Sequence, residues 1–317
     1  MRLVHRKLAR YLLVLLAILT LNFALPRLMP GDPALNLMGE HFAYDPETID
    51  EVRSKLGLEG PVHLQFLRYL GDLAQGDLGY SFTFKRPVAE TIWMHLPWTL
   101  LLLIPAVITG ALIALVLGTL AGWHRNSRLD LTLSSAALLV YSMPHYWIAM
   151  LVVMLFSFRL GLFPLAGAYS GSVEGVESIA DLLWHLALPL GVVTLYKASY
   201  DLVIVRNSVI TTMAEDHVIA AMARGVPLSV VLVRHVVRNS LAPLVTVTAL
   251  QFGNIFAGAL LVEIVFSWPG MGTMIFDAVG GRDYPLLQAS FMIIAVCVLV
   301  ANIVADFTYA RLDPRIN

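Results

Sequence analysis

Apolar residues dominate six long stretches of this chain, and polar residues gather in the segments between them. The stretches cover approximately residues 11–28, 98–122, 131–156, 186–205, 242–266 and 288–309. A helix needs about 20 mostly apolar residues to cross the hydrocarbon core of a bilayer, so each stretch predicts one membrane-spanning helix. Pro105, Pro144 and Pro189 fall within or at the ends of these stretches, where a neighbouring helix can cover the carbonyl group that a proline leaves free.

The basic residues between the stretches predict an orientation in which both termini are cytoplasmic. Twelve of the 21 basic residues then lie in inner segments, and short inner segments are where positive charge sets membrane topology. These residues are Arg2, Arg6, Lys7, Arg10, Arg125, Arg128, Arg206, Arg224, Arg234, Arg238, Arg311 and Arg315. The first stretch continues into residues 27–33 without a small-x-small cleavage pattern, so we expect it to remain as an anchor and not to be removed as a signal peptide.

Composition narrows the class of protein further. Hydrophobic residues make up 58% of the 317 residues and charged residues 14%, and so few charges cannot cover a water-facing surface. The formal net charge of −1 gives no indication of nucleic-acid binding. The single cysteine, Cys297, excludes an internal disulfide and a cysteine-built metal site. None of the four lysines follows a glycine, so the chain has no P-loop for ATP, and its histidines show no metal-binding spacing.

The outer segment, residues 30–97, carries two helix signals. Asp45-Pro46-Glu47 is typical of a helix start, and that helix can stop at Gly57. A second apolar-periodic stretch runs from Pro61 to about Ala74. We expect a small helical cap over the outer ends of the spans; a docking surface for a partner outside is the alternative.

The inner segment, residues 206–241, predicts two short helices joined by a tight turn. Thr212 and Glu215 have the spacing of a capping box, and Gly225 suits the left-handed position after a helix, just before Pro227. A second helix beginning near Pro227 would place Arg234 and Arg238 on one face, four residues apart. Such a hairpin is either a passive connector or a rigid protrusion that engages another protein. A DNA-reading helix pair is implausible because both ends enter the membrane within a few residues.

Several motifs in this segment resemble the inner-membrane permeases of binding-protein-dependent ABC importers, most closely the oligopeptide, dipeptide and nickel branch. The EAA loop of that family has its counterpart in Ile-Ala-Ala-Met-Ala-Arg-Gly at residues 219–225, with isoleucine in place of the glutamate. The gap from Gly225 to Pro243 is longer than the general pattern. It resembles the peptide branch, whose Arg-His-x-x-Arg-Asn-x-Leu-x-Pro matches residues 234–243.

Further similar motifs extend over nearly the whole chain. They are Leu-Met-Pro-Gly-Asp-Pro at 28–33, Gly-Asp-Leu-Gly-Tyr-Ser-Phe at 76–82, Arg-Pro-Val at 86–88, Glu-Ile-Val-Phe-Ser-Trp-Pro-Gly-Met-Gly at 263–272, Arg-Asp-Tyr-Pro at 282–285 and Leu-Asp-Pro-Arg at 312–315. Each motif is weak alone, but their shared order and spacing are specific.

The resemblance implies an all-α membrane protein with the type I ABC importer permease fold, located in a prokaryotic inner membrane. It implies a second homologous permease, two cytoplasmic ATPases that hold ATP and Mg²⁺, and an extracytoplasmic substrate-binding protein as partners, with no cofactor, metal or catalytic residue in this chain. It also implies that an ATPase-coupling loop lies within residues 206–243. The residues so implicated are Asp216, Ala220, Ala221, Gly225, Arg234, Arg238 and Pro243.

Ionisable and polar residues inside the spans are functional candidates, because charge is costly in lipid. Lys197 and Asp201 lie four apart in the fourth span and predict either a self-neutralised structural pair or a contact to a charged peptide terminus. Gln251, Asn254 and Asn302 are further candidates, although polar residues between spans more often join helices than bind ligands.

The sequence therefore predicts three parts: residues 1–29 as a cytoplasmic end and first span, residues 30–97 outside, and residues 98–317 as a permease core with five spans. We expect a peptide-importing permease subunit. A nickel chelate, an opine or a glutathione-like cargo is an alternative within the same class. An ion-coupled secondary transporter would need matching halves with interrupted helices, and an intramembrane enzyme would need a catalytic constellation; the sequence shows neither.

Overall fold

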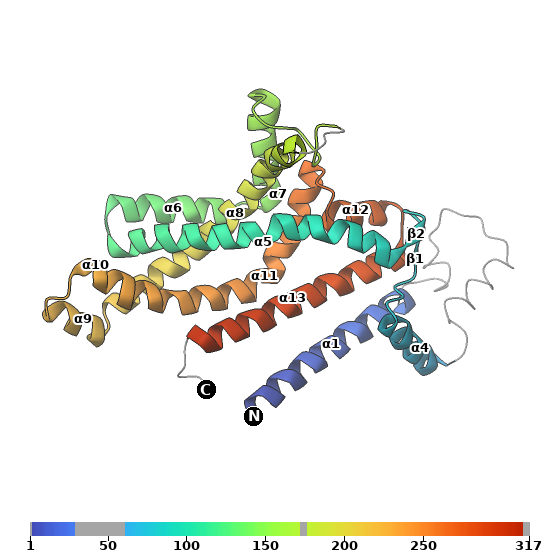
Figure 1. The fold of residues 1–317 in the computed structure, drawn as a ribbon, viewed down its shortest axis with the longest axis horizontal. Helices are drawn as coiled ribbons and strands as arrows, with labels where there is room; N and C mark the ends of the chain where they lie inside the picture. Colours follow the sequence, from blue (N-terminus) through green and yellow to red (C-terminus); the bar gives the residue numbers. More distant parts are fainter. Residues whose placement is uncertain (1, 29–60, 172–175, 313–317) are drawn as a thin grey trace. The chain divides into compact units, whose positions relative to one another are not determined.

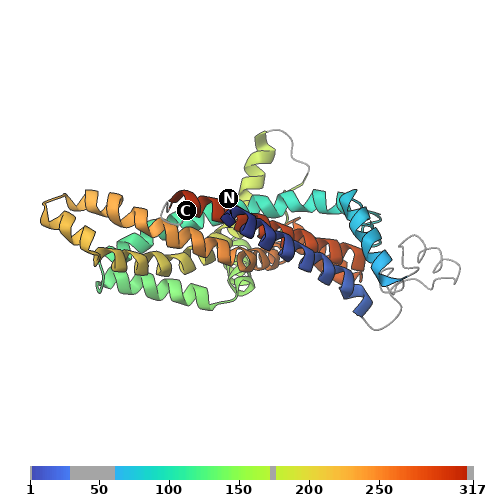
Figure 2. The same ribbon diagram turned by 90° about the horizontal axis from the view of Figure 1, so that it is seen from below.

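The computed structural model describes residues 2–28, 61–171 and 176–312, and apart from one short hairpin the regular elements in these ranges are helices (Figures 1 and 2). The chain divides into two compact units. The first comprises Met1–Trp98 and Gly270–Leu299, and the second comprises Thr99–Pro269 and Val300–Asn317. The helix predicted over residues 45–57 lies outside the described residues.

The first unit is built from helices α1 (Arg2–Leu28), α4 (Val62–Ala74) and α12 (Met271–Gly280). It also holds the N-terminal parts of α5 (Val88–Trp123) and α13 (Tyr284–Leu312). The α4 helix confirms the prediction made from the apolar periodicity between Pro61 and about Ala74. Its Phe66 and Tyr69 pack on Phe23 of α1, with ring centroids 5.1 and 5.6 Å from that of Phe23. The Asn22 side-chain amide donates to the Tyr69 hydroxyl at 3.2 Å.

A two-stranded hairpin in the first unit joins two of the sequence motifs. Strands β1 (Tyr80–Ser81) and β2 (Arg86–Pro87) pair antiparallel. The buried Asp283 carboxylate accepts hydrogen bonds from the Ser81 hydroxyl at 2.6 Å and from the backbone N–H of Thr83 at 2.9 Å. Its other oxygen accepts from the N–H of Leu286 in the first turn of α13, at 3.2 Å. The Tyr-Ser-Phe and Arg-Asp-Tyr-Pro motifs are therefore two halves of one structural element.

The second unit holds α6 (Arg128–Ser142), α7 (His145–Val152), α8 (Val176–Met213), α9 (Asp216–Ala223), α10 (Leu228–Val230) and α11 (Arg238–Phe266), with the remaining parts of α5 and α13. Two π-helical segments, η1 (Val153–Arg159) and η2 (Val231–Val237), continue α7 and α10. The long α8 packs against α6 and α11 and forms the centre of this unit (Figure 1).

The length and composition of the described helices are consistent with several membrane crossings. Four are long and apolar enough to cross: Val88–Trp123, Ser178–Met213, Leu228–Thr248 and Tyr284–Val304. Two bent pairs of helices raise that number to six if each pair forms one span. The chain is thus a largely helical, multi-pass protein, whereas six spans with both termini in the cytoplasm stay a prediction.

The predicted third span is not one straight helix. It breaks into α6 and α7, which meet at an angle of 101° when α7 is taken with η1. Met143 is extended, with φ −92° and ψ 138°, and Pro144 caps the next helix. A proline disfavours helical geometry in the residue before it, so this proline ends a helix, while Pro105 and Pro189 remain inside continuous helices.

The predicted helical hairpin of the inner segment also needs correction. The predicted cap residue Thr212 is buried inside α8, and the short helix α9 begins after Glu215, whose side chain makes no capping hydrogen bond. The second helix is not short, because α10, η2 and α11 follow one another directly from Leu228 to Phe266. One short helix therefore lies between two long ones.

Candidate functional site

The end of α9 forms the sharp turn that its sequence predicts. Gly225 has a φ of 77°, in the left-handed region that only glycine adopts without strain. Its N–H donates to the Met222 carbonyl at 2.9 Å, and the N–H of Val226 donates to the Ala221 carbonyl at 3.2 Å. This pair of bonds is the Schellman motif. Pro227 then starts α10.

One face of α9 is fastened to the long helices beside it. Val218 and Ala221 are fully buried and pack with Val205 and Val209 of α8 and with residues of η2 and α11. Packing on both neighbours gives a short helix the stability that it lacks alone. α9 is thus a firmly seated part of the second unit.

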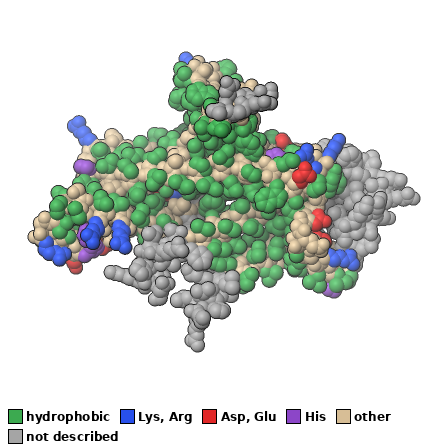
Figure 3. Space-filling view, viewed as in Figure 1, with side chains coloured by type: hydrophobic (Ala, Val, Ile, Leu, Met, Phe, Trp, Pro, Cys, Tyr) green, Lys and Arg blue, Asp and Glu red, His purple; other side chains and the backbone are tan. Residues whose placement is uncertain are grey.

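The opposite face of α9 and the helix after it are open. Asp216, Ala220 and Gly225 are exposed, and the space that a Cβ atom on Gly225 would enter contains no atom of the described residues within 4 Å. Arg234 and Arg238 are exposed as well, and Figure 3 shows basic side chains gathered around α9 and α10. Pro243 is half-buried inside α11. Apart from Pro243, the predicted residues therefore form a small, basic-flanked exposed surface around α9, with Ala221 as its buried anchor.

Lys197 and Asp201 form the predicted ion pair within α8. Both are fully buried; the Lys197 ammonium donates to the Asp201 carboxylate and, at 2.9 Å, to the Thr248 hydroxyl of α11. The Lys197 stem lies against Gly110 of α5, where a Cβ atom would stand 2.8 Å from it. The pair thus joins three helices. The second Asp201 oxygen has no hydrogen-bond partner among the described residues.

Among the described residues, the other intramembrane candidates do not form a common site with this pair. Asn254 is exposed on α11 and Asn302 is half-buried on α13, and the Gln251 side chain lies outside the described residues. Within the described ranges, no three His, Cys, Asp or Glu side chains are placed to hold a metal ion.

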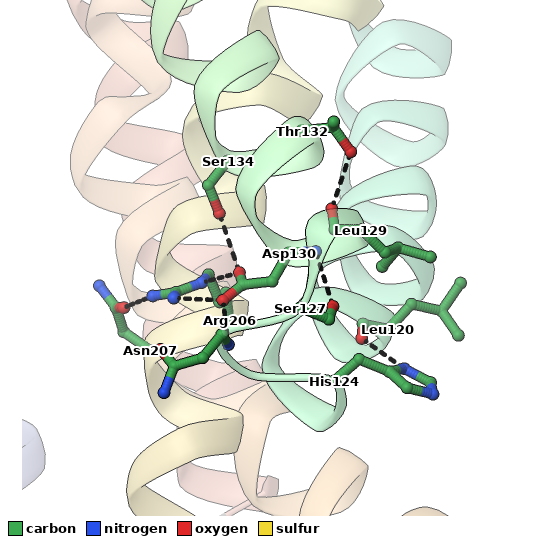
Figure 4. A network of polar contacts seen from close by, with 10 residues as sticks. Leu120, His124, Ser127, Leu129, Asp130, Thr132, Ser134, Arg206 and Asn207 are labelled. Carbon is green, nitrogen blue, oxygen red and sulfur yellow. Dashed lines mark hydrogen bonds and ion pairs between the residues drawn. The ribbon is translucent and has the colours of Figure 1, made fainter.

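An ion pair that sequence reasoning did not single out connects α6 to α8. The Asp130 carboxylate receives two bonds from the Arg206 guanidinium, at 2.5 and 2.7 Å, in the bidentate geometry of a strong charge-assisted pair (Figure 4). Asp130 belongs to none of the sequence motifs described above. Its position near the start of one helix, with Arg206 just after the fourth apolar stretch, was the available signal.

A cluster of aromatic rings at the break between α6 and α7 was also missed. The His145 ring lies on Tyr196 of α8 with centroids 3.5 Å apart, and Tyr141 contacts both Tyr196 and Tyr200. A Cβ atom on Gly258 of α11 would stand 2.5 Å from the His145 ring. The break is therefore packed tightly between α8 and α11.

Comparison with known families and proteins gives a consistent result. The family described as binding-protein-dependent transport system inner membrane component matches residues 114–317, and the N-terminal part of such components matches residues 1–103. A peptide permease protein of Brucella suis is 37% identical over 305 residues, covering 96% of this chain and 95% of the relative. The di/tripeptide transport system permease protein DppB of Pseudomonas aeruginosa is 34% identical, covering 99% and 98%.

A solved structure shares the fold at low sequence identity. The crystal structure of an amino acid ABC transporter with histidines has a TM-score of 0.51 and 14% identity, and the match covers 70% of this chain and 94% of that one.

Proposed function

This chain belongs to the family of binding-protein-dependent transport system inner membrane components, and from that membership we propose that it forms part of the path by which an ATP-driven importer takes up di- and oligopeptides. It is a permease subunit of the ABC importer class, of the peptide branch. Peptide cargo is supported by the similarity along almost the whole length to permeases named for peptides and dipeptides.

The proposed assembly contains a second homologous permease, two cytoplasmic ATPases and an extracytoplasmic substrate-binding protein in a bacterial inner membrane. The dependence on a binding protein that defines the family supports this set of partners. The chain itself has no Gly-Lys-Ser/Thr sequence, so ATP and Mg²⁺ belong to the ATPases. Binding of ATP would shift the permease pair between inward- and outward-open states.

The observation that carries the coupling proposal is the seating of α9. Its inner face is packed through Val218 and Ala221, while Asp216, Ala220 and Gly225 are open. A partner ATPase that contacts the open face would displace α9 together with α8, because the two helices share one hydrophobic cluster. The Lys197–Asp201 pair does not favour an ion-driven carrier, since each charge is neutralised by the other within one helix.

Purification of the tagged chain from its native membrane tests the assembly. We expect a second permease and one or two P-loop ATPases to co-purify, and ATP-dependent peptide uptake when these are reconstituted with the binding protein. Isolation of the chain alone, in a detergent that preserves known importer complexes, would contradict the proposal.

The turn at Gly225 tests the coupling role. We expect Gly225→Trp to abolish transport while the chain still inserts, because the added ring enters the open space in which a partner would contact the turn. The left-handed φ of 77° adds a backbone strain of about 1–2 kcal/mol. Gly225→Asn is the matched control, since asparagine tolerates the left-handed conformation and adds less bulk. Uptake should be measured beside membrane insertion of each variant, and full transport by the Trp variant would remove the coupling role.

A further inference from the structure

The Asp130 carboxylate is saturated with hydrogen bonds that hold one end of α6 in place. One oxygen accepts from Nε of Arg206 and from the Ser134 hydroxyl, at 2.5 and 3.2 Å. The other accepts from the second guanidinium nitrogen and from the N–H of Asn126, at 2.7 and 2.9 Å. Asp130 is only 3% exposed. Figure 4 shows Asp130 and Ser134 of α6 facing Arg206 of α8.

Arg206 is held on two sides by the hairpin of α5 and α6. Its side chain reaches Asp130 on α6, and its backbone lies against α5, where a Cβ atom on Gly122 would stand 2.8 Å from the Arg206 carbonyl oxygen. Gly118, one turn earlier, lies equally close to the Leu202 carbonyl. Contact between backbones is possible only with small residues. The hairpin and this part of α8 are therefore in direct contact at both backbone and side-chain level.

The same part of α8 carries α9. Val205 and Val209 lie on either side of Arg206 in the sequence, and they pack with Val218 and Ala221 of α9. A displacement of α9 thus acts on the turn of α8 that contains Arg206, as well as on η2. The Arg206 guanidinium on this turn is bonded to Asp130, so its movement would pull on α6.

We propose that the Asp130–Arg206 ion pair is a clamp, a positioning element that makes the α5–α6 hairpin follow the movement of α9 during ATP-driven transport. The proposal rests on the coupling role given to α9 above. An exposed ion pair would be a weak candidate, because such pairs contribute little. This pair is bidentate, and its carboxylate is buried, so loss of one partner strands a charge and releases the helix end.

A distance measurement tests the clamp without reference to transport. Spin labels would replace Leu139 on α6 and Val233 on η2, both more than half exposed, in a Cys297→Ser background. We expect one narrow distance distribution in the native chain and a broadened or shifted one in Asp130→Asn. Arg206→Lys keeps the positive charge but loses the bidentate geometry of the guanidinium, so it should give an intermediate distribution. It replaces Asp130→Asn in this test if that variant does not fold. An unchanged distribution in both variants overturns the clamp.

Transport measured per ATP hydrolysed in the reconstituted complex tests the role in coupling. We expect Asp130→Asn to lower this ratio at least about fivefold, the lower end of the usual coupling range, with ATP hydrolysis and assembly retained. Ser127→Ala is the matched control, because it removes the cap at the same helix end, a bond of 3.2 Å from the Asp130 N–H, but leaves the ion pair. A ratio as high as that of the native complex, or an equal loss in Ser127→Ala, overturns the coupling role.

The two proposals fail in different ways. Absence of ATP-driven uptake in the native complex would count against the proposed function, and the distance measurement would still decide the clamp. Native uptake with an undiminished ratio in Asp130→Asn would overturn the clamp's role alone.

Discussion

Lys197 illustrates how a charged side chain is held inside an apolar unit. Its ammonium has two partners, Asp201 in the same helix and Thr248 in α11, and its stem lies on Gly110. The spacing of four in the sequence was sufficient to predict the bond to Asp201. Thr248 was not predictable, because it lies 51 residues away and meets Lys197 only where α8 packs on α11.

We predict that Lys197→Ala destabilises the protein more than the double variant Lys197→Ala with Asp201→Ala. The single change leaves the buried Asp201 carboxylate unpaired, and breaking a buried ion pair in this way lowers the free energy of unfolding by about 3–5 kcal/mol. The double change removes both charges. Thermal unfolding of the purified protein measures the difference. Thr248→Ala, which removes one hydrogen bond, should cost only about 1 kcal/mol. Equal losses in the single and double variants would mean that the pair is not coupled.

At the scale of elements, small residues set the distance between α5 and α8. Gly118 and Gly122 each stand where a Cβ atom would lie 2.8 Å from a carbonyl oxygen of α8, and Ala114 is fully buried between them and Gly110. These four residues repeat every four positions, so they form one stripe along the helix. The pattern was visible in the sequence, but which helix it would contact was not.

We predict that Gly118→Leu lowers the free energy of unfolding by about 1–3 kcal/mol or more, because overpacking forces two helices apart. Gly191→Leu is the matched control, since Gly191 lies on α8 with nothing within 4 Å of its potential Cβ atom, and there leucine should be neutral or stabilising. Denaturation curves of the two variants give the comparison. Similar stability of both variants would contradict close packing at Gly118.

Helix ends were predicted well where one residue determines them and poorly where packing does. Gly225 and Pro227 end and begin helices as expected, because a left-handed φ and a missing N–H are local properties. Thr212 was wrongly given a capping role, since α8 continues through it while Val205 and Val209 pack on α9. The hydrophobic pattern did not reveal the break at Pro144, because apolar residues continue on both sides of the point where α6 ends.

At the scale of the whole molecule, the predicted orientation in the membrane rests on charge. Arg224, Arg234 and Arg238 are exposed around α9, and basic residues remain on the cytoplasmic side. The motif that follows the fifth apolar stretch, with α12, is expected on the opposite side.

We predict that a cysteine in place of His124, in the exposed turn between α5 and α6, reacts with a membrane-impermeant maleimide only from the cytoplasmic side. A cysteine in place of Phe276, 61% exposed on α12, should react only from outside. Both belong in a Cys297→Ser background, and intact cells and inverted vesicles provide the two sides. Labelling of both positions from one side would contradict the predicted topology.

The sequence by itself determined the class of protein and its helical nature, and it predicted where a coupling segment would lie. Hydrophobic length, charge bias and the order of motifs are properties of the chain alone, and they agree with the family to which it belongs. Only the tertiary structure decided which motifs meet. Ser81 and Asp283 are 202 residues apart, and Asp130 and Arg206 are 76 apart. Such contacts depend on which helix faces pack together, and a side chain's own helix cannot specify that.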